Sequence, residues 1–154
     1  MISSRLQSTS QQRTTEEVFY DHLEKRKKGL VEEDIAENYS PEVVQLTCMG
    51  TYHGHEGVRE GDRILKESLP NGRFEYYNIL CDGGLVFLEW RAFSDGREVN
   101  QGADSFIIRD GRIVAQTIHY KVAKAPRRNK LYKVLLLAAA VSALAMLGLT
   151  QKTE

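Results

Sequence analysis

Two carboxylic acids and one histidine are the residues of this chain best suited to proton-transfer chemistry if folding brings them together: Glu89, Asp104 and His119. Carboxylates and imidazoles can take up a proton and return it near neutral pH, as general acid-base catalysis requires. An imidazole paired with a carboxylate is held in one tautomer and stays basic. We therefore predict that Asp104 and His119 are the acid and base of a catalytic site and that Glu89 orients His119.

Three turn signals predict that the second half of the chain folds back on itself. Asp82-Gly83-Gly84, Ser94-Asp95-Gly96 and Arg109-Asp110-Gly111 separate four runs of apolar, β-branched and aromatic residues between positions 73 and 122. Asp-Gly between such runs is a strong hairpin signal, because both residues tolerate the positive φ of a tight turn. We expect the four runs to form an antiparallel meander.

Strand pairing across these turns gathers the three candidates. If the Asp-Gly dipeptides form the turn centres, Gly102 lies opposite both Glu89 and His119, and Asp104 lies in the next row. The predicted site face then carries Leu85, Phe87, Glu89, Gly102, Asp104, Phe106, Ile108, Ile113, Ala115, Thr117 and His119. Because one end of this face is apolar, we expect a cavity in which burial raises the pKa of Asp104.

Each candidate also has a structural interpretation. Asp104 could simply accept a hydrogen bond from Thr117 or from a backbone amide, and Glu89 with His119 could form an ion pair at the rim of the cavity. The opposite face carries Val86, Leu88 and Trp90, among other apolar residues. An exposed aromatic residue such as Trp90 is often an interface anchor, so we predict a homodimer that forms through this outer face.

Six further residues are predicted to contact a ligand. Phe87 and Thr117 flank Asp104 in its row, and alternation adds Tyr76 and Asn78 to the same face as hydrogen-bond donors to a carbonyl oxygen. Tyr52 and His53 are expected at the mouth of the pocket. The segment His53-Gly54-His55-Glu56 is interrupted by glycine and lacks a His-Glu-x-x-His pattern, so we predict neither a metal site nor a cofactor.

Helices precede the meander. Thr14 and Thr15 before two glutamates, with Gly29 after four basic residues, predict a helix over about 15–28. Its apolar stripe is Val18, Phe19, His22 and Leu23. A second helix is predicted over about 31–39, a strand over 43–48, and a third helix that ends before Pro70-Asn71-Gly72. This order is an α+β layout with helices gathered on one face of a bent sheet.

This order resembles the SnoaL-like branch of the nuclear transport factor two-like superfamily, over about residues 15–122. The segments that carry the resemblance are Tyr52-His53-Gly54-His55-Glu56-Gly57-Val58 and Phe106-Ile107-Ile108-Arg109-Asp110-Gly111-Arg112-Ile113. The resemblance implies a cone-shaped roll, with three N-terminal helices packed on a curved, mainly antiparallel sheet around a pocket. The superfamily includes ketosteroid isomerases, scytalone dehydratase, limonene epoxide hydrolase and non-catalytic modules, and no complete catalytic set of these enzymes matches this sequence.

Two functions remain open at this point. The first is a pocket enzyme that transfers protons on a small hydrophobic carbonyl compound, as an isomerase, cyclase, dehydratase or hydrolase. The second is a non-catalytic ligand-binding or dimeric assembly module held at a membrane. Twenty-one acidic and 21 basic residues balance, so the overall charge does not favour a nucleic-acid partner.

The two ends of the chain differ in character from the middle. We predict a disordered leader over 1–14, a SnoaL-like domain over 15–123 and a basic linker over 124–133. Residues 134–149 contain no charge, so we predict a hydrophobic helix over 134–150. With residues from 131 onward it approaches the length of a membrane span, and the preceding basic residues would keep the domain on the cytoplasmic side. A helix buried against protein is the alternative.

Overall fold

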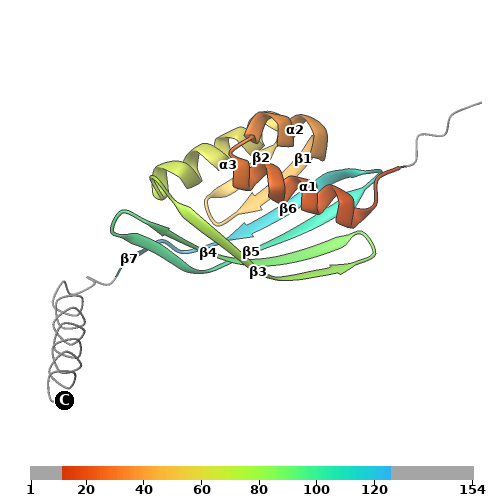
Figure 1. Ribbon diagram of the computed structural model, residues 1–154. Coiled ribbons are helices and arrows are strands. Elements are labelled where there is room, and N and C mark those ends of the chain that lie inside the picture. Colours follow the sequence, from red (N-terminus) through yellow and green to blue (C-terminus); the bar gives the residue numbers. More distant parts are fainter. Residues whose placement is uncertain (1–11, 126–154) are drawn as a thin grey trace, which may run out of the picture. The chain divides into compact units, whose positions relative to one another are not determined.

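The computed structural model describes residues 12–125, which form three helices and seven strands in one layered unit. Figure 1 shows the helices on one side of a curved sheet. In chain order the elements are α1 (Thr15–Lys28), α2 (Val31–Asn38), β1 (Tyr39–Thr47), β2 (Gly50–His53), α3 (Gly54–Ser68), β3 (Arg73–Asp82), β4 (Leu85–Ser94), β5 (Arg97–Arg109), β6 (Arg112–His119) and β7 (Ala123–Lys124). The predicted α+β layout is confirmed.

Helix α1 begins and ends where its sequence signals predict. The Thr14 hydroxyl accepts a hydrogen bond from the backbone of Glu17, and the Glu17 carboxylate accepts one from the backbone of Thr14, which together form a capping box. Gly29 ends the helix with a φ of 73°, a left-handed conformation that glycine adopts without strain. Within these ends His22 and Leu23 share the buried face of α1 with Val18 and Phe19.

The sheet has the strand order β2-β1-β6-β5-β4-β3, and β7 pairs with β5. The four-stranded meander from β3 to β6 is antiparallel, as predicted. Strand β1 lies parallel to β6, which makes the sheet mixed, and β2 turns back along β1. The chain of β1 therefore brings Tyr39 and Gln45 beside the last strand of the meander, although about 70 residues separate them in sequence.

The predicted strand register is correct near the turns and wrong in the middle of the sheet. Ser94 pairs with Arg97 and Arg109 with Arg112, as expected. Between Trp90 and Ala92 of β4, however, β5 contains one extra residue, and β6 contains another next to Ile113. A β-bulge of one residue exchanges the two faces of a strand for every position beyond it.

The bulges leave Asp104 on the inner face but change its neighbours. Asp104 lies opposite Leu88 on one side and Ile118 on the other, in place of the predicted Phe87 and Thr117. Trp90 lies opposite Gly102 and is 3% exposed. The prediction that Trp90 is on the outer face is therefore wrong.

The hydrophobic core lies between the helices and this inner face. It combines Val18, Phe19 and Leu23 of α1 with large residues of the sheet: Tyr39, Val43, Val86, Leu88, Trp90, Phe106, Ile108 and Ile113. Phe19 and His22 both pack against the ring of Phe106. Helix α1 is thus held directly over the part of β5 that carries Asp104.

The predicted features at the chain ends lie largely outside the described residues. This applies to most of the leader over 1–14, to the linker from 126 onward and to the hydrophobic segment over 134–150. Within residues 12–125, no helix has the length and apolar character needed to cross a membrane.

Candidate active site

A cavity of about 160 Å³ opens between the helices and the inner face of the sheet. Its wall is mostly apolar and includes Leu23, Val58, Ile64, Leu65, Phe74, Leu88 and Ile118. Polar side chains interrupt this wall, among them His22, Arg26, Tyr39, Gln45, Asp62, Tyr76, Asp104 and Gln116. An apolar pocket with a few convergent polar groups is the usual form of a small-molecule site.

Asp104 is the acidic group on the sheet side of the cavity. Its Oδ1 accepts a hydrogen bond of 2.8 Å from the indole Nε1 of Trp90, and its Oδ2 accepts one of 3.0 Å from Nε2 of Gln116. Burial raises the pKa of Asp104 to about 6, although both donors and the charge of Arg26 act in the opposite direction. The predicted rise in this pKa is confirmed. Asp104 can therefore exist with or without its proton near neutral pH.

A chain of amide groups holds Gln116 in place. Oε1 of Gln116 accepts hydrogen bonds from the Tyr39 hydroxyl at 2.9 Å and from Nε2 of Gln45 at 2.7 Å. With its oxygen occupied in this way, Gln116 donates its own hydrogen bond through Nε2 to Asp104. The hydrogen bonds of Tyr39, Gln45 and Gln116 thus form a series that ends at Asp104. The other amide atom of Gln45, Oε1, is buried and accepts no hydrogen bond from the described residues.

Gly102 creates the space for the Trp90 ring that reaches Asp104. A side-chain carbon placed on Gly102 would lie only 2.3 Å from Cε2 of Trp90, far inside contact distance. We expected this glycine to leave room for a ligand between Glu89 and His119. Instead the indole occupies the space and directs its N–H to Asp104.

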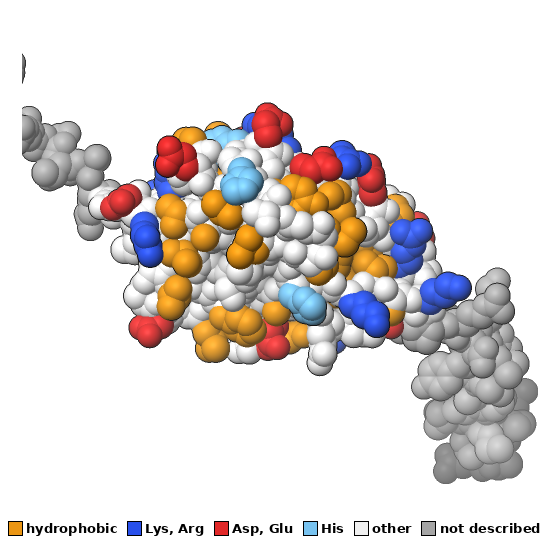
Figure 2. Space-filling view, turned by 180° about the vertical axis from the view of Figure 1, so that it is seen from behind, with side chains coloured by type: hydrophobic (Ala, Val, Ile, Leu, Met, Phe, Trp, Pro, Cys, Tyr) orange, Lys and Arg blue, Asp and Glu red, His pale blue; other side chains and the backbone are white. Residues whose placement is uncertain are grey.

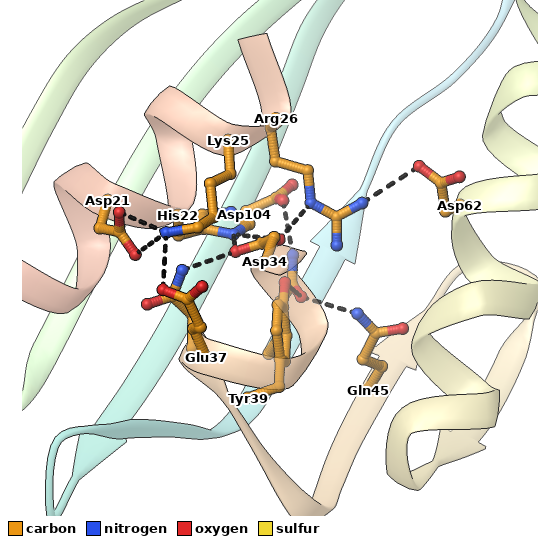
Figure 3. Close-up of polar contacts among 12 residues, drawn as sticks. Asp21, His22, Lys25, Arg26, Asp34, Glu37, Tyr39, Gln45, Asp62 and Asp104 are labelled. Carbon is orange, nitrogen blue, oxygen red and sulfur yellow. Dashed lines mark hydrogen bonds and ion pairs between the residues drawn. The ribbon is translucent and has the colours of Figure 1, made fainter. Parts of the chain in front are cut away.

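The helix side of the cavity carries a buried ionic cluster (Figure 3). Nδ1 of His22 lies 3.0 and 2.9 Å from the two carboxylate oxygens of Asp34, which is completely buried on α2. Nε of Arg26 donates to Asp34 at 2.6 Å, and its Nη1 donates to Asp62 of α3 at 3.1 Å. Asn38 adds a further hydrogen bond to Asp34 at 2.9 Å. One cluster therefore joins all three helices.

Burial sets the charge of the His22 and Asp34 pair. Removal from water lowers the pKa of His22 below its usual value, and the attraction of Asp34 only partly opposes this. Burial alone would raise the pKa of Asp34, but His22, Arg26 and Asn38 together outweigh it and lower this pKa. Asp34 is thus an anion, and neutral His22 donates its single N–H hydrogen to Asp34 from Nδ1.

Two further nitrogens of this cluster belong to residues that line the cavity. Within residues 12–125, Nε2 of His22 makes no hydrogen bond and is not sealed inside protein. The third nitrogen of Arg26, Nη2, is held by neither carboxylate, and the guanidinium also interacts with the Tyr39 side chain. Figure 3 shows the third guanidinium nitrogen of Arg26 pointing to the side on which Tyr39 and Gln45 lie. The cavity therefore offers one cationic donor and, at His22, one acceptor.

Glu89 and His119 are not in this site. Both pair with Ala103 of β5, not with Gly102, and therefore lie on the outer face of the sheet. Glu89 accepts a 2.5 Å hydrogen bond from Asn78, and His119 is exposed. The predicted grouping of Glu89 and His119 with Asp104 is wrong because the bulges in β5 and β6 reverse the faces.

The predicted ligand contacts divide in the same way. Tyr52 and Tyr76 line the cavity, as predicted. Because of the same bulges, Phe87 and Thr117 lie on the outer face. There they border a separate surface groove. Asn78 forms a third bulge, with a φ of 47°, and is exposed.

His53 is the last residue of β2 and is also exposed, outside the cavity. It directly precedes α3, whose first residue is Gly54. Among the residues that the structure describes, no group of three His, Cys, Asp or Glu side chains is arranged to hold a metal ion.

Sequence reasoning missed His22, Arg26, Asp34, Gln45 and Gln116. One usable signal existed, because His22 occupies a position in the apolar stripe of the first predicted helix. A titratable group in such a stripe must find a buried partner. The partners come from α2, so their identity could be found only once the packing of the two helices was known.

Residues 17–116 match the model of the SnoaL-like domain family. The chain belongs to the SnoaL-like family. A search of curated proteins gave no match. This family membership agrees with the helix order and the curved sheet described above.

Solved structures with the same fold are distant in sequence. An NTF2-like protein of unknown function from Cytophaga hutchinsonii has 13% identity and a TM-score of 0.58, with 73% of this chain and 95% of that chain covered. A protein from Kribbella flavida assigned as a ketosteroid isomerase has 14% identity and a TM-score of 0.59, with 79% and 89% covered. One from Sinorhizobium meliloti assigned as a polyketide cyclase has 17% identity and a TM-score of 0.57, with 66% and 92% covered. At this distance the likeness establishes the NTF2-like fold and no activity.

Proposed function

We propose that the SnoaL-like domain is an enzyme that moves a proton between carbon atoms of a small carbonyl compound, with Asp104 as the general base. The observation that carries this proposal is the state of Asp104: a buried carboxylate at the wall of an apolar cavity, oriented by two N–H donors. A base with a pKa near the working pH combines a useful ionised fraction with a useful driving force for proton transfer.

The hydrogen bonds to Asp104 leave it able to react. Trp90 and Gln116 each occupy one lone pair of one carboxylate oxygen, and a carboxylate has about four such acceptor positions. The remaining lone pairs can accept a proton from a ligand in the cavity. Because Trp90 and Gln116 are themselves held by packing and hydrogen bonds, the direction of these lone pairs is fixed before a ligand enters.

Arg26 supplies the complementary charge in this proposal. Removing a proton beside a carbonyl group places negative charge on the carbonyl oxygen, and a fixed cationic donor stabilises that charge in a dry site. Two of the three guanidinium nitrogens are held by Asp34 and Asp62, and the third, Nη2, lies on the side of Tyr39, from where it donates to the ligand in this proposal. The two carboxylates thus aim the donor and keep it in place.

The cavity limits the size of the substrate. An engineered protein cavity of about 150 Å³ accommodates benzene, so about 160 Å³ suits a compound of one or two small rings. The apolar wall favours a hydrophobic skeleton over a sugar or a phosphate ester.

The test is hydrogen exchange at the carbon next to a carbonyl group. The protein is incubated with 1-indanone in D₂O, and loss of the C2 proton signal is followed by NMR, with the spontaneous rate subtracted. We expect Asp104→Asn to slow the protein-dependent exchange by about 100-fold or more, in the range that general bases contribute.

Glu89→Gln is the matched control, because it makes the same chemical change on the outer face of the sheet. It should exchange 1-indanone at the wild-type rate. If wild-type protein binds the ketone without accelerating exchange, and Asp104→Asn binds it equally well, the non-catalytic binding function replaces the enzymatic one.

We also propose that the outer sheet face forms a homodimer. Leu46, Leu80 and Leu85 lie on this face and are 51%, 58% and 58% exposed. Figure 2, which views the domain from behind, shows patches of hydrophobic side chains on this side of the molecule, with most of the charged ones toward its edges. Sedimentation of the wild type and of Leu85→Glu tests this, because the charged variant should be monomeric; equal masses would contradict the dimer.

The uncharged segment after the basic linker supports a proposed membrane tether. Residues 134–149 carry no charge and follow Arg127, Arg128, Lys130 and Lys133. The full chain should fractionate with membranes and require detergent, whereas a chain that ends at residue 130 should not. Equal distribution of both chains would overturn the tether.

A further inference from the structure

We infer that His22 recognises a hydroxyl group of the substrate and transfers its proton, so that the substrate class is α-hydroxy ketones. This inference rests on the proposed function and extends it. Asp104 would handle the proton on carbon and His22 the proton on oxygen. Three observations carry the inference: the Asp34 partner, the unpartnered Nε2 and the shared cavity.

His22 can only accept a hydrogen bond from a ligand. Its single N–H hydrogen is on Nδ1 and binds Asp34, which leaves Nε2 with a lone pair and no hydrogen. A ligand that carries only a carbonyl oxygen has no hydrogen to offer this atom. A buried acceptor without a donor is costly, so the ligand that fits this wall carries a hydroxyl or N–H group.

Burial keeps His22 in this neutral state against the net effect of the charged groups around it. Arg26 lies beside it on α1 and opposes its protonation, whereas Asp34 on α2 and Asp21 on α1 favour it. Tyr39 of β1 packs edge-on against the imidazole at 5.6 Å between ring centres, and Phe106 of β5 lies at 5.3 Å. The ring is therefore clamped, and only its Nε2 edge is open to the cavity.

Arg26 lines the same cavity as His22. Arg26 is the donor that suits the ketone oxygen. The wall thus offers one acceptor for a hydroxyl hydrogen together with one donor for a carbonyl, as an α-hydroxy ketone requires.

The reaction that uses all these groups is a ketol shift through an enediol. Asp104 takes the hydrogen from the carbon that bears the hydroxyl group, and the C–H electron pair forms a carbon–carbon double bond. The carbonyl electron pair moves to its oxygen, which faces Arg26, while Nε2 of His22 takes the hydroxyl proton and gives it to that oxygen. Return of the proton from Asp104 to the former carbonyl carbon completes the shift. Every proton removed is returned, so no oxidant, reductant or co-reactant is needed.

The substitution that isolates this role is His22→Asn. The amide nitrogen of asparagine occupies the place of Nδ1 and can still donate to Asp34, but nothing replaces Nε2. The exposed His119→Asn on the outer face is the matched control. Exchange at C2 is measured for two ketones that differ by one hydroxyl group, 1-indanone and 2-hydroxy-1-indanone.

We expect His22→Asn to reduce exchange of 2-hydroxy-1-indanone at least tenfold more than exchange of 1-indanone. The wild-type protein should also convert 2-hydroxy-1-indanone to 1-hydroxy-2-indanone, and His119→Asn should behave as the wild type does. If His22→Asn slows both ketones equally, its effect is structural and the inference is wrong.

A binding measurement separates this inference from the proposed function. In protein labelled with ¹⁵N-histidine, the Nε2 resonance of His22, identified by its loss in His22→Asn, should shift with 2-hydroxy-1-indanone and not with 1-indanone. If the wild type exchanges neither ketone but this selective shift occurs, the proton-transfer function fails and hydroxyl recognition by His22 stands. If neither ketone, or both alike, shifts the resonance, the inference is overturned whatever the exchange rates are.

Discussion

The two faces of the central sheet carry similar kinds of side chain and use them differently. On the outer face, Glu89, Thr117 and His119 are in contact with water, and the hydrogen bond from Asn78 to Glu89 is exposed. On the inner face, Asp104 and Gln116 form a buried network with Trp90, and His22 meets Asp34 above it. Residue type therefore does not separate the two faces.

What separates them is one extra residue in each of two strands. Without the bulges in β5 and β6, Glu89 and His119 would share a face with Asp104, and Trp90 would be outside. With them, the indole is brought to Asp104 and the histidine comes from a helix instead. Bulges are common next to active sites because they redirect side chains in this way.

The sharpest way to test this difference is to remove one charge from the inner cluster. Asp34→Asn leaves Arg26 buried with one fewer carboxylate and replaces one of the two oxygens that face His22 with an N–H donor. Breaking a buried ion pair by removal of one partner costs about 3–5 kcal/mol in the free energy of unfolding. Urea denaturation of the variant and the wild type at pH 7 gives this value.

Glu75→Gln on the outer face is the comparison for that experiment. Glu75 accepts a hydrogen bond of 2.7 Å from Arg91, but the pair is exposed to water. Exposed pairs contribute little to stability, so the effect should be far smaller than that of Asp34→Asn. Equal losses from the two variants would mean that burial of the inner cluster has no energetic consequence.

The next effect in size is the pH dependence of stability that Asp104 produces. Its folded-state pKa of about 6 lies above the ordinary value of 3.8, so the folded protein holds this proton more tightly than the unfolded chain. The resulting stabilisation is complete below pH 3.8 and is lost as the pH rises through 6. A difference of roughly two pKa units corresponds to at most about 3 kcal/mol.

Asp104→Asn removes this dependence. The free energy of unfolding of the variant minus that of the wild type should therefore increase between pH 4 and pH 7, by up to about 3 kcal/mol. All other titrating groups are shared and cancel in the difference. Denaturation curves at four pH values are sufficient, and a difference that stays constant with pH would show that Asp104 is not desolvated.

Local signals in the sequence predicted most of the elements, because caps and turns are set by a few adjacent residues. Thr14 with Glu17, Gly29 and the three glycine turns all act where they were expected. The faces of the strands could not be predicted equally well. A bulge depends on how neighbouring strands and the helices above them pack. Asn100 lies in the bulge of β5 and Val114 in that of β6, and neither residue type is a sequence signal for a bulge.

The site divides in the same way into a part that local sequence predicts and a part that depends on packing. Asp104 was identified because its own hairpin places it near the apolar end of the strand. His22 and Asp34 belong to two helices, and their contact depends on the angle at which those helices cross the sheet. A buried network spread over three helices and four strands leaves no continuous motif in the sequence.

The smallest expected effect comes from a substitution at Gly102, which tests whether this glycine is needed to place Trp90 beside Asp104. Its backbone conformation is ordinary, so the objection to a larger residue is purely steric: a Cβ would lie 2.3 Å from the Trp90 ring. Gly102→Ala should therefore move the indole and weaken its hydrogen bond to Asp104, at a cost of about 1–3 kcal/mol. Trp90 is the only tryptophan in the chain, so its fluorescence reports the movement directly.

In a Trp90→Leu background, Gly102→Ala should cost much less, because the smaller leucine side chain can move away. Equal costs in both backgrounds would show that Gly102 is needed for some reason other than the position of the indole ring.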